Sequence, residues 1–184
     1  MSENKWQVRD VALPGESSIC GLYEVTELAD AYAIRLPHDA VSDPELLARF
    51  MFGQPSPWVK GLMRLRDTLV AGFGLKTARQ MQTASPSELG QRIAIFRIYS
   101  KTANEIVLGE NDKHLDFRIS VLRRMEATAS GQAPYLIVST VVHCHNLLGR
   151  SYLKVITPFH RMLSRSTLRR AARAGWPSTA QVIY

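Results

Sequence analysis

Residues 114–124 read HLDFRISVLRR, and their side chains alternate between apolar and polar types. The apolar set is Leu115, Phe117, Ile119 and Val121, and the polar set is His114, Asp116, Arg118 and Ser120. Alternation with a period of two is typical of a β-strand that buries one face and exposes the other. This stretch therefore predicts a half-buried strand.

Three neighbouring stretches have a similar period and flank this strand. They cover residues 93–99, 105–109 and 134–146, and polar turn segments at 101–104, 110–113 and 129–132 separate the strands. Short turns between successive strands favour an antiparallel sheet. A further strand is predicted at 30–36, where Tyr32, Ile34 and Leu36 alternate with smaller or charged residues before Pro37.

Helical patterns lie on either side of these strands. Asp43 and Pro44 predict a helix that ends at Gly53, and an apolar stripe predicts a second helix from Pro57 to about residue 73. A long C-terminal helix is expected over 148–174, and we favour a kink at Pro158 over a break because the apolar stripe continues past it. Residues 77–90 are polar and are interpreted as a loop; whether this loop is a lid stays open.

The order of these elements predicts an α+β fold in one domain. Strands cluster after a helical pair, which is not the order of a parallel α/β protein. We expect a single domain over residues 1–184, with a core at about 15–174 and short tails. A curved antiparallel sheet with the long helix packed across it, a helix-grip arrangement, would bury both apolar surfaces and often leaves a cavity.

Composition narrows the class of protein further. The N-terminus lacks the apolar stretch of a secretory signal, and no apolar run approaches the roughly 20 residues needed to cross a bilayer. Cys20 and Cys144 lie far apart and form no ligand-spaced pair. We therefore expect a cytoplasmic protein that is not integral to a membrane and has no metal, disulfide or cofactor.

Several short stretches resemble a known bacterial family. They are Asp112-Lys113-His114-Leu115-Asp116-Phe117-Arg118, His145-Asn146-Leu147-Leu148-Gly149-Arg150, Thr157-Pro158-Phe159-His160-Arg161, Asp30-Ala31-Tyr32-Ala33 and Pro57-Trp58-Val59. Together they resemble domain-of-unknown-function family 2867 over residues 15–174. This resemblance implies kinship with the START-like, polyketide-cyclase-like superfamily, whose members are helix-grip domains that usually bind apolar small molecules. It implies no catalytic residues.

The leading hypothesis is that the protein binds an apolar small molecule between the sheet and the C-terminal helix, with a fully packed interior as the alternative. The candidate pocket residues are Tyr32, Ile34, Leu115, Phe117, Ile119, Val141, His143, His145, Leu153, Ile156 and Phe159. The apolar members would enclose the ligand, and a histidine would orient it by a hydrogen bond.

The role of His143 and His145 depends on strand register. A hairpin centred on Ser130 would pair residues whose numbers sum to about 260, which puts both histidines in the apolar face. A shift by one residue would instead place them beside His114 and Asp116, as a possible metal or acid–base cluster. Two histidines alone leave zinc short of ligands. An alternative function is an enzyme of the cyclase, isomerase or hydrolase type that uses His143, His145 or His114 as an acid–base group in the same cavity.

The positive charge is concentrated at the C-terminal end. The net charge is +7, no acidic residue follows Glu126, and seven basic residues supply the excess. Arg161, Arg165, Arg169 and Arg173 recur near helical spacing and are candidates for weak contact with anionic surfaces; the simpler explanation, a solvated helix face, is favoured. Residues for reading bases are absent from this pattern, so specific nucleic-acid binding is not expected. A packed interaction module that uses this basic helix is the third hypothesis.

Overall fold

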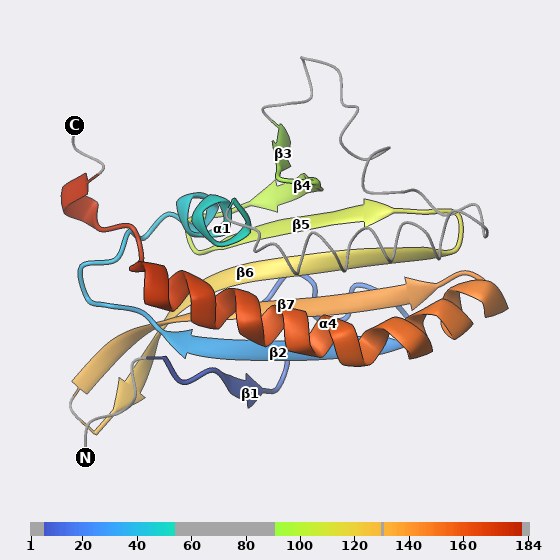
Figure 1. Ribbon diagram of the computed structural model, residues 1–184, viewed down its shortest axis with the longest axis horizontal. Coiled ribbons are helices and arrows are strands. Elements are labelled where there is room, and N and C mark those ends of the chain that lie inside the picture. Colours follow the sequence, from blue (N-terminus) through green and yellow to red (C-terminus); the bar gives the residue numbers. More distant parts are fainter. Residues whose placement is uncertain (1–5, 54–90, 130, 182–184) are drawn as a thin grey trace.

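The computed structural model describes residues 6–53, 91–129 and 131–181. Its centre is a seven-stranded antiparallel sheet with the strand order β1-β2-β7-β6-β5-β4-β3 (Figure 1). The strands are β1 (Arg9–Val11), β2 (Leu28–Arg35), β3 (Arg92–Ile93), β4 (Phe96–Lys101), β5 (Glu105–Asn111), β6 (Leu115–Thr128) and β7 (Gly131–Cys144). The helices of the described ranges are α1 (Pro44–Phe52), α4 (Leu147–Ala174) and the 3₁₀ turn η2 (Thr179–Gln181).

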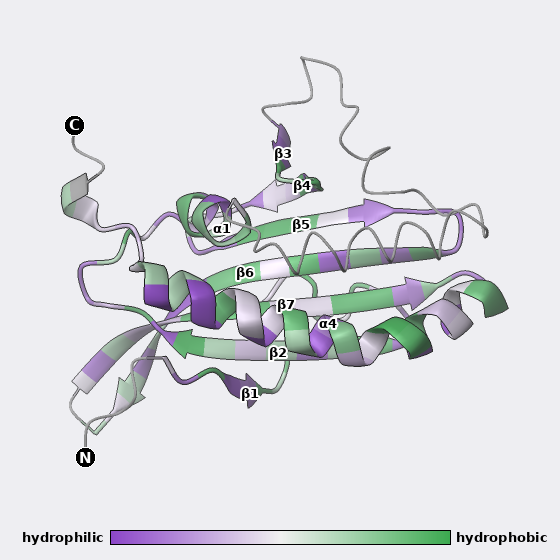
Figure 2. Cartoon of the chain, in the orientation of Figure 1, coloured by the Kyte–Doolittle hydropathy of each residue, from purple (hydrophilic) through white to green (hydrophobic). Residues whose placement is uncertain are grey.

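The long hairpin of β6 and β7 forms the middle of the sheet. Its residue pairs run from Thr128 and Gly131 at the turn to Leu115 and Cys144 at the open end. Leu115, Phe117, Ile119 and Val121 lie on the face that the helices cover, as the alternation of residues 114–124 predicts. In the hydropathy view, α4 lies across β7 and β2, and apolar stretches occur along β2, β5, β6 and β7 (Figure 2).

Helices α4 and α1 cover one face of the sheet, which we call the inner face (Figure 1). Asp43 begins α1 by accepting a hydrogen bond from the backbone N–H of Glu45, with Pro44 in the first turn. The largest cluster of buried residues joins α1 and the C-terminal half of α4 to Ile34, Ile106, Val121 and Leu136 of the sheet. The helices therefore bury the apolar sides of four neighbouring strands.

Helix α4 continues through Pro158 without a break. Pro158 has no N–H to donate, so the carbonyl four residues earlier loses its helical partner. The hydroxyl of the preceding residue, Thr157, donates to the carbonyl of Leu153 at 2.6 Å. The prediction of one helix, not two, is confirmed.

A segment between β1 and β2, residues 12–27, covers the opposite or outer face of the sheet. Ile19 is buried against Val107 and Val141. The carboxylate of Glu105 accepts hydrogen bonds from the hydroxyls of Ser17 and Ser120, both at 2.5 Å. A strand residue thus fixes the segment to the sheet.

The α+β prediction is confirmed: the sheet is antiparallel, and a long C-terminal helix packs on it. The predicted helix from Pro57 and the loop at 77–90 lie outside the described residues. The short strand β1 was not expected from the sequence, and a turn at residues 94–95 divides the predicted strand at 93–99 into β3 and β4. Among the described residues, no helix combines the length and apolar character needed to cross a membrane.

Candidate functional site: a pocket on the outer face of the sheet

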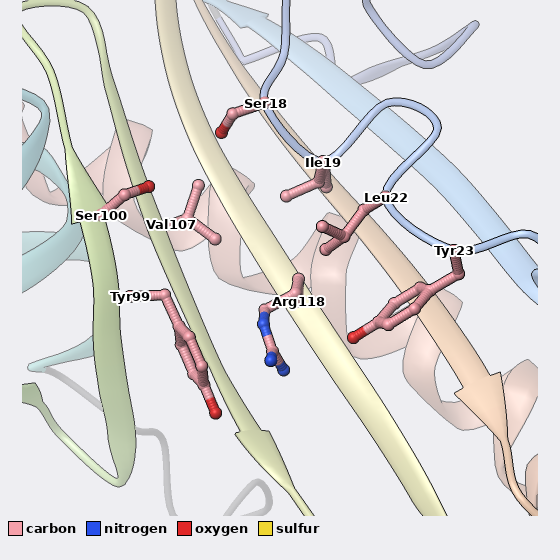
Figure 3. Close-up of a pocket in the computed structure, with 8 residues that line it drawn as sticks. All are labelled: Ser18, Ile19, Leu22, Tyr23, Tyr99, Ser100, Val107 and Arg118. Carbon is pink, nitrogen blue, oxygen red and sulfur yellow. The ribbon is translucent and has the colours of Figure 1, made fainter.

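A pocket of about 240 Å³ opens between the N-terminal segment and the outer face of the sheet (Figure 3). It lies on the side of the sheet away from α4. Its lining residues are Ser18, Ile19, Leu22, Tyr23, Tyr99, Ser100, Val107 and Arg118. Four come from the N-terminal segment, and the others come from β4, β5 and β6.

Two local features of the strands shape this pocket. The register between β4 and β5 shifts between Ile98 and Ser100, so Tyr99 is an extra residue in a β-bulge. A bulge changes which way side chains point, and here both Tyr99 and Ser100 line the outer pocket. Gly109 pairs with Arg118, and a side chain at Gly109 would lie 2.9 Å from Arg118 Cδ. The missing side chain lets Arg118 reach across β5 toward Tyr99.

Arg118 lies at the centre of the pocket and is only 9% exposed. Its Cζ atom lies 3.6 Å from the centre of the Tyr99 ring. Nη1 donates to the carbonyl of Phe117 at 2.8 Å and, more weakly, to that of Glu110 at 3.5 Å. Within the described residues, no carboxylate lies at salt-bridge distance from this guanidinium, so its charge is balanced only by carbonyl dipoles and a ring.

Tyr23 forms the other side of the pocket. In the close-up its hydroxyl points toward Arg118 (Figure 3). The hydroxyl oxygen is buried and has no hydrogen-bond partner among the described residues. Burial raises the pKa of Tyr23, and the charge of Arg118 partly opposes this shift. The pocket therefore contains a neutral phenol donor beside a fixed cation.

His143 of β7 and His145, which directly follows β7, lie on the outer face near Tyr23. Asp116 pairs with His143 across the strands, so the structure has the second of the two registers considered from the sequence. His145 Nε2 lies 3.1 Å from Asp116 Oδ1, and the Tyr23 ring stacks on His143 at 5.5 Å. His143 Nδ1 also contacts the carbonyl of Val25 at 2.7 Å.

The predicted pocket residues are split between the two faces. Seven lie on the inner face, where they belong to or pack against the buried clusters: Tyr32, Ile34, Leu115, Phe117, Ile119, Leu153 and Ile156. Val141, His143 and His145 lie on the outer face, and Phe159 on α4 is 41% exposed. The structure thus brings together the inner residues as a group, without the histidines that would orient a ligand there.

The side chain of His114 is buried and contacts the residue that begins α4. It is 6% exposed, and its Nδ1 atom lies 3.2 Å from Oδ1 of Asn146. The same Asn146 oxygen accepts from the backbone N–H of Gly149 and begins α4. This contact joins two of the stretches that carry the family resemblance, and it serves the start of a helix.

The arginines of α4 differ in their surroundings. Arg165 forms an ion pair with Asp10, and Arg161 Nε lies 4.0 Å from Asp30. Arg169 and Arg173 are exposed near the end of the helix. Half of the predicted anion-contact set therefore already faces carboxylates of β1 and β2.

Sequence patterns missed most of the outer pocket. Tyr23 and Leu22 belong to a segment without periodicity, and nothing in the sequence marks the bulge at Tyr99. The alternation around Arg118 did place it on the face opposite Phe117. Over the described ranges, no group of three or more histidine, cysteine, aspartate or glutamate residues is arranged to hold a metal ion.

The fold and the pocket define an α+β protein with a pocket of small-molecule size on the outer face of its sheet. A family model described as "Protein of unknown function (DUF2867)" matches residues 22–167, and the chain belongs to this family. The match includes Tyr23, Tyr99, Arg118, His143 and His145. No curated protein and no solved structure matches the chain.

Proposed function

We propose that the protein binds a small molecule in the pocket on the outer face. The observation that carries this proposal is the pocket itself, in which apolar Ile19, Leu22 and Val107 adjoin the polar groups of Arg118 and Tyr23. A concave apolar surface with a few converging polar groups is the usual form of a ligand site. At about 240 Å³ the pocket is smaller than typical sites for drug-sized ligands, which favours a small metabolite.

The START-like resemblance supports a binding function but suggests a different place for it. A long helix packed on an antiparallel sheet is compatible with a helix-grip domain, whose members usually hold apolar molecules between the two. In this protein the described side chains at that interface, such as Leu115, Leu153 and Ile156, pack against one another. We therefore favour the outer pocket over a cavity beneath α4.

Methyl-resolved NMR with a panel of small metabolites tests this proposal. A ligand in the outer pocket shifts the methyl signals of Ile19, Leu22 and Val107 and leaves those of Leu153 and Ile156 unchanged. Native mass spectrometry of freshly purified protein identifies any ligand that co-purifies. Leu22→Trp, at a 47% exposed position on the pocket wall, should fill the pocket without disturbing the core and abolish the shifts.

The opposite pattern would contradict the proposed site. Shifts at Leu153 and Ile156 alone would place the ligand between the sheet and α4. If no compound in the panel shifts either group, the binding function itself is rejected.

A second candidate function, acid–base catalysis, is favoured by the contact of His145 with Asp116. A carboxylate 3.1 Å from an imidazole nitrogen can orient the ring for proton transfer. The pair adjoins the pocket through His143 and Tyr23. Its position suits proton transfer to or from a bound molecule, as in an isomerase.

Tautomerisation of phenylpyruvate tests this candidate, because that reaction needs only proton transfer. If the pair is catalytic, His145→Gln and Asp116→Asn each lower the rate enhancement at least tenfold. The exposed His38 provides the matched control, and His38→Gln should leave the rate unchanged. Equal rates with all the variants and without protein would remove this function for that substrate class.

A further inference from the structure

We infer that the ligand of the outer pocket is a small monocarboxylate with an apolar body, such as a single-ring arylalkanoic acid. This inference rests on the pocket function proposed above and specifies its ligand class. It follows from three observations: the charge of Arg118, a Tyr23 hydroxyl without a hydrogen-bond partner in the described part of the chain, and the apolar walls.

The positive charge of Arg118 would be stabilised by a bound anion. Arg118 is only 9% exposed as a residue, and an arginine so little exposed is ordinarily paired with a carboxylate, because burial of an unpaired charge is unfavourable. The nearby carboxylates on the outer face have other partners: Asp116 contacts His145, and Glu105 is surrounded by serine hydroxyls. Since no carboxylate of the described residues pairs with Arg118, we assign the anion that completes the site to a ligand.

The type of anion follows from the number of donors. A guanidinium presents two parallel N–H groups that match the two oxygens of a carboxylate. The buried hydroxyl of Tyr23 supplies one more donor at the same place. One cation and one phenol suit a singly charged group, whereas a phosphate with two charges and three free oxygens would leave acceptors unpaired.

The body of the ligand follows from the walls. Ile19 and Val107 are almost fully buried and present only hydrocarbon, and Leu22 continues this surface outward. The rings of Tyr23 and Tyr99 stand on either side of Arg118 (Figure 3). A carboxylate bound to Arg118 would therefore direct an apolar group of about one ring toward these walls.

Phenylacetate and its neutral isostere phenylacetamide test the inference on the full chain, with dissociation constants measured by NMR titration. We expect phenylacetate to shift the methyl signals of Ile19, Leu22 and Val107, and phenylacetamide to bind at least tenfold more weakly. Arg118→Gln should weaken phenylacetate binding at least tenfold and leave phenylacetamide unchanged. Tyr23→Phe should weaken phenylacetate binding about threefold to tenfold.

Matched controls separate a specific contact from a general effect of charge. Arg169→Gln removes one positive charge at an exposed position of α4, on the other side of the sheet. This variant should bind phenylacetate like the parent protein. Arg118→Lys keeps the charge but loses the paired donors, so we expect an intermediate loss. Its methyl spectrum also reports whether the fold survives substitution at this site.

The outcomes distinguish this inference from the pocket function. If phenylacetate and phenylacetamide bind equally, or if Arg118→Gln binds phenylacetate like the parent, the monocarboxylate inference is overturned while the pocket stands. Tighter binding of phenyl phosphate than of phenylacetate would also overturn it. If phenylacetate does not bind but neutral panel members do, only the ligand class fails; if nothing binds, both proposals fail.

Discussion

Glu105 keeps a negative charge in a buried position because every nearby group that contacts it is a donor. Its carboxylate accepts from the hydroxyls of Ser17, Ser18 and Ser120 and from the backbone N–H of Ser18. Burial raises the pKa of Glu105, but these hydrogen bonds outweigh burial and hold the pKa below its ordinary value of 4.5. The folded state thus favours the charged form.

Glu105→Gln should therefore lower the free energy of unfolding at pH 7. Hydrogen bonds to a charged group contribute about 1.5–3 kcal/mol, and the amide would present a donor to hydroxyls that now donate. Because the folded pKa is lowered, this contribution is complete above pH 4.5 and is lost as pH falls through the folded pKa. Urea unfolding at pH 7 and pH 3 measures the difference between the two proteins.

The control for this substitution is Glu24→Gln, in the same segment but exposed, which should change stability little at either pH. A loss for Glu105→Gln that stays equal at pH 3 and pH 7 would contradict the charge-based explanation.

Gly109 makes room for the side chain at the centre of the pocket. A Cβ atom there would lie 2.3 Å from the carbonyl oxygen of Phe117 and 2.9 Å from Arg118 Cδ. The first contact is with backbone, so it cannot be relieved by rotating a side chain. We expect Gly109→Ala to lower the unfolding free energy by about 1–3 kcal/mol, as overpacking does, and to weaken phenylacetate binding. Gly15→Ala has open space around its Cβ and should do neither.

At the scale of elements, the start of α4 depends on Asn146. This residue satisfies the N–H of Gly149 and contacts His114, so one side chain fixes the helix to the loop before β6. Asn146→Ala should lower the unfolding free energy by about 0.5–2 kcal/mol, the usual loss for a helix cap. Thermal unfolding followed by circular dichroism measures the change. Leu147→Ala, at a 77% exposed neighbour, should have almost no effect and shows whether the loss is specific to the cap.

The sequence predicted the types and bounds of the helices and strands better than the register with which the strands pair. β6, β7, α1 and α4 have strong periodicity or caps, so their types and approximate bounds could be read directly. The register of β6 and β7 could not, because a difference of one residue in the turn exchanges the two faces for every partner. The first register considered, with numbers summing to 260, put His143 in the apolar face; the observed pairing of Asp116 with His143 sums to 259.

The candidate site was harder to predict for a related reason. The bulge at Tyr99 comes from the pairing of two strands, which single-strand periodicity does not encode. Residues 12–27 have neither helical nor strand periodicity, and they are held on the sheet by Glu105, far away in sequence. Arg118 was assigned to the correct strand face, but its lack of a carboxylate partner is a property of the assembled sheet.

At the scale of the whole molecule, the sheet separates the N-terminal segment from the helices, and one cysteine lies on each side of it. The two cysteines differ in their exposure to solvent. Cys20 belongs to the N-terminal segment and is exposed, whereas Cys144 is buried beneath the start of α4 with Leu153. Burial, with a smaller contribution from the negative charge of Glu27, raises the pKa of the Cys144 thiol to about 11. Since the thiolate is the reactive form, the native protein should expose one reactive thiol.

Labelling with Ellman's reagent at pH 8 should therefore give one fast thiol in the native protein and two in urea. Cys144 reacts only when α4 separates from the sheet, so its slow rate measures how often that contact opens. Gly149→Ala should accelerate this slow phase, because a Cβ there would lie 2.2 Å from the carbonyl oxygen of His114 and would push the helix away. Cys20→Ser should remove the fast phase alone. Two fast thiols in the native protein would mean that α4 does not protect Cys144 from solvent. An unchanged slow rate in Gly149→Ala would mean that the first turn of α4 does not control the separation of α4 from the sheet.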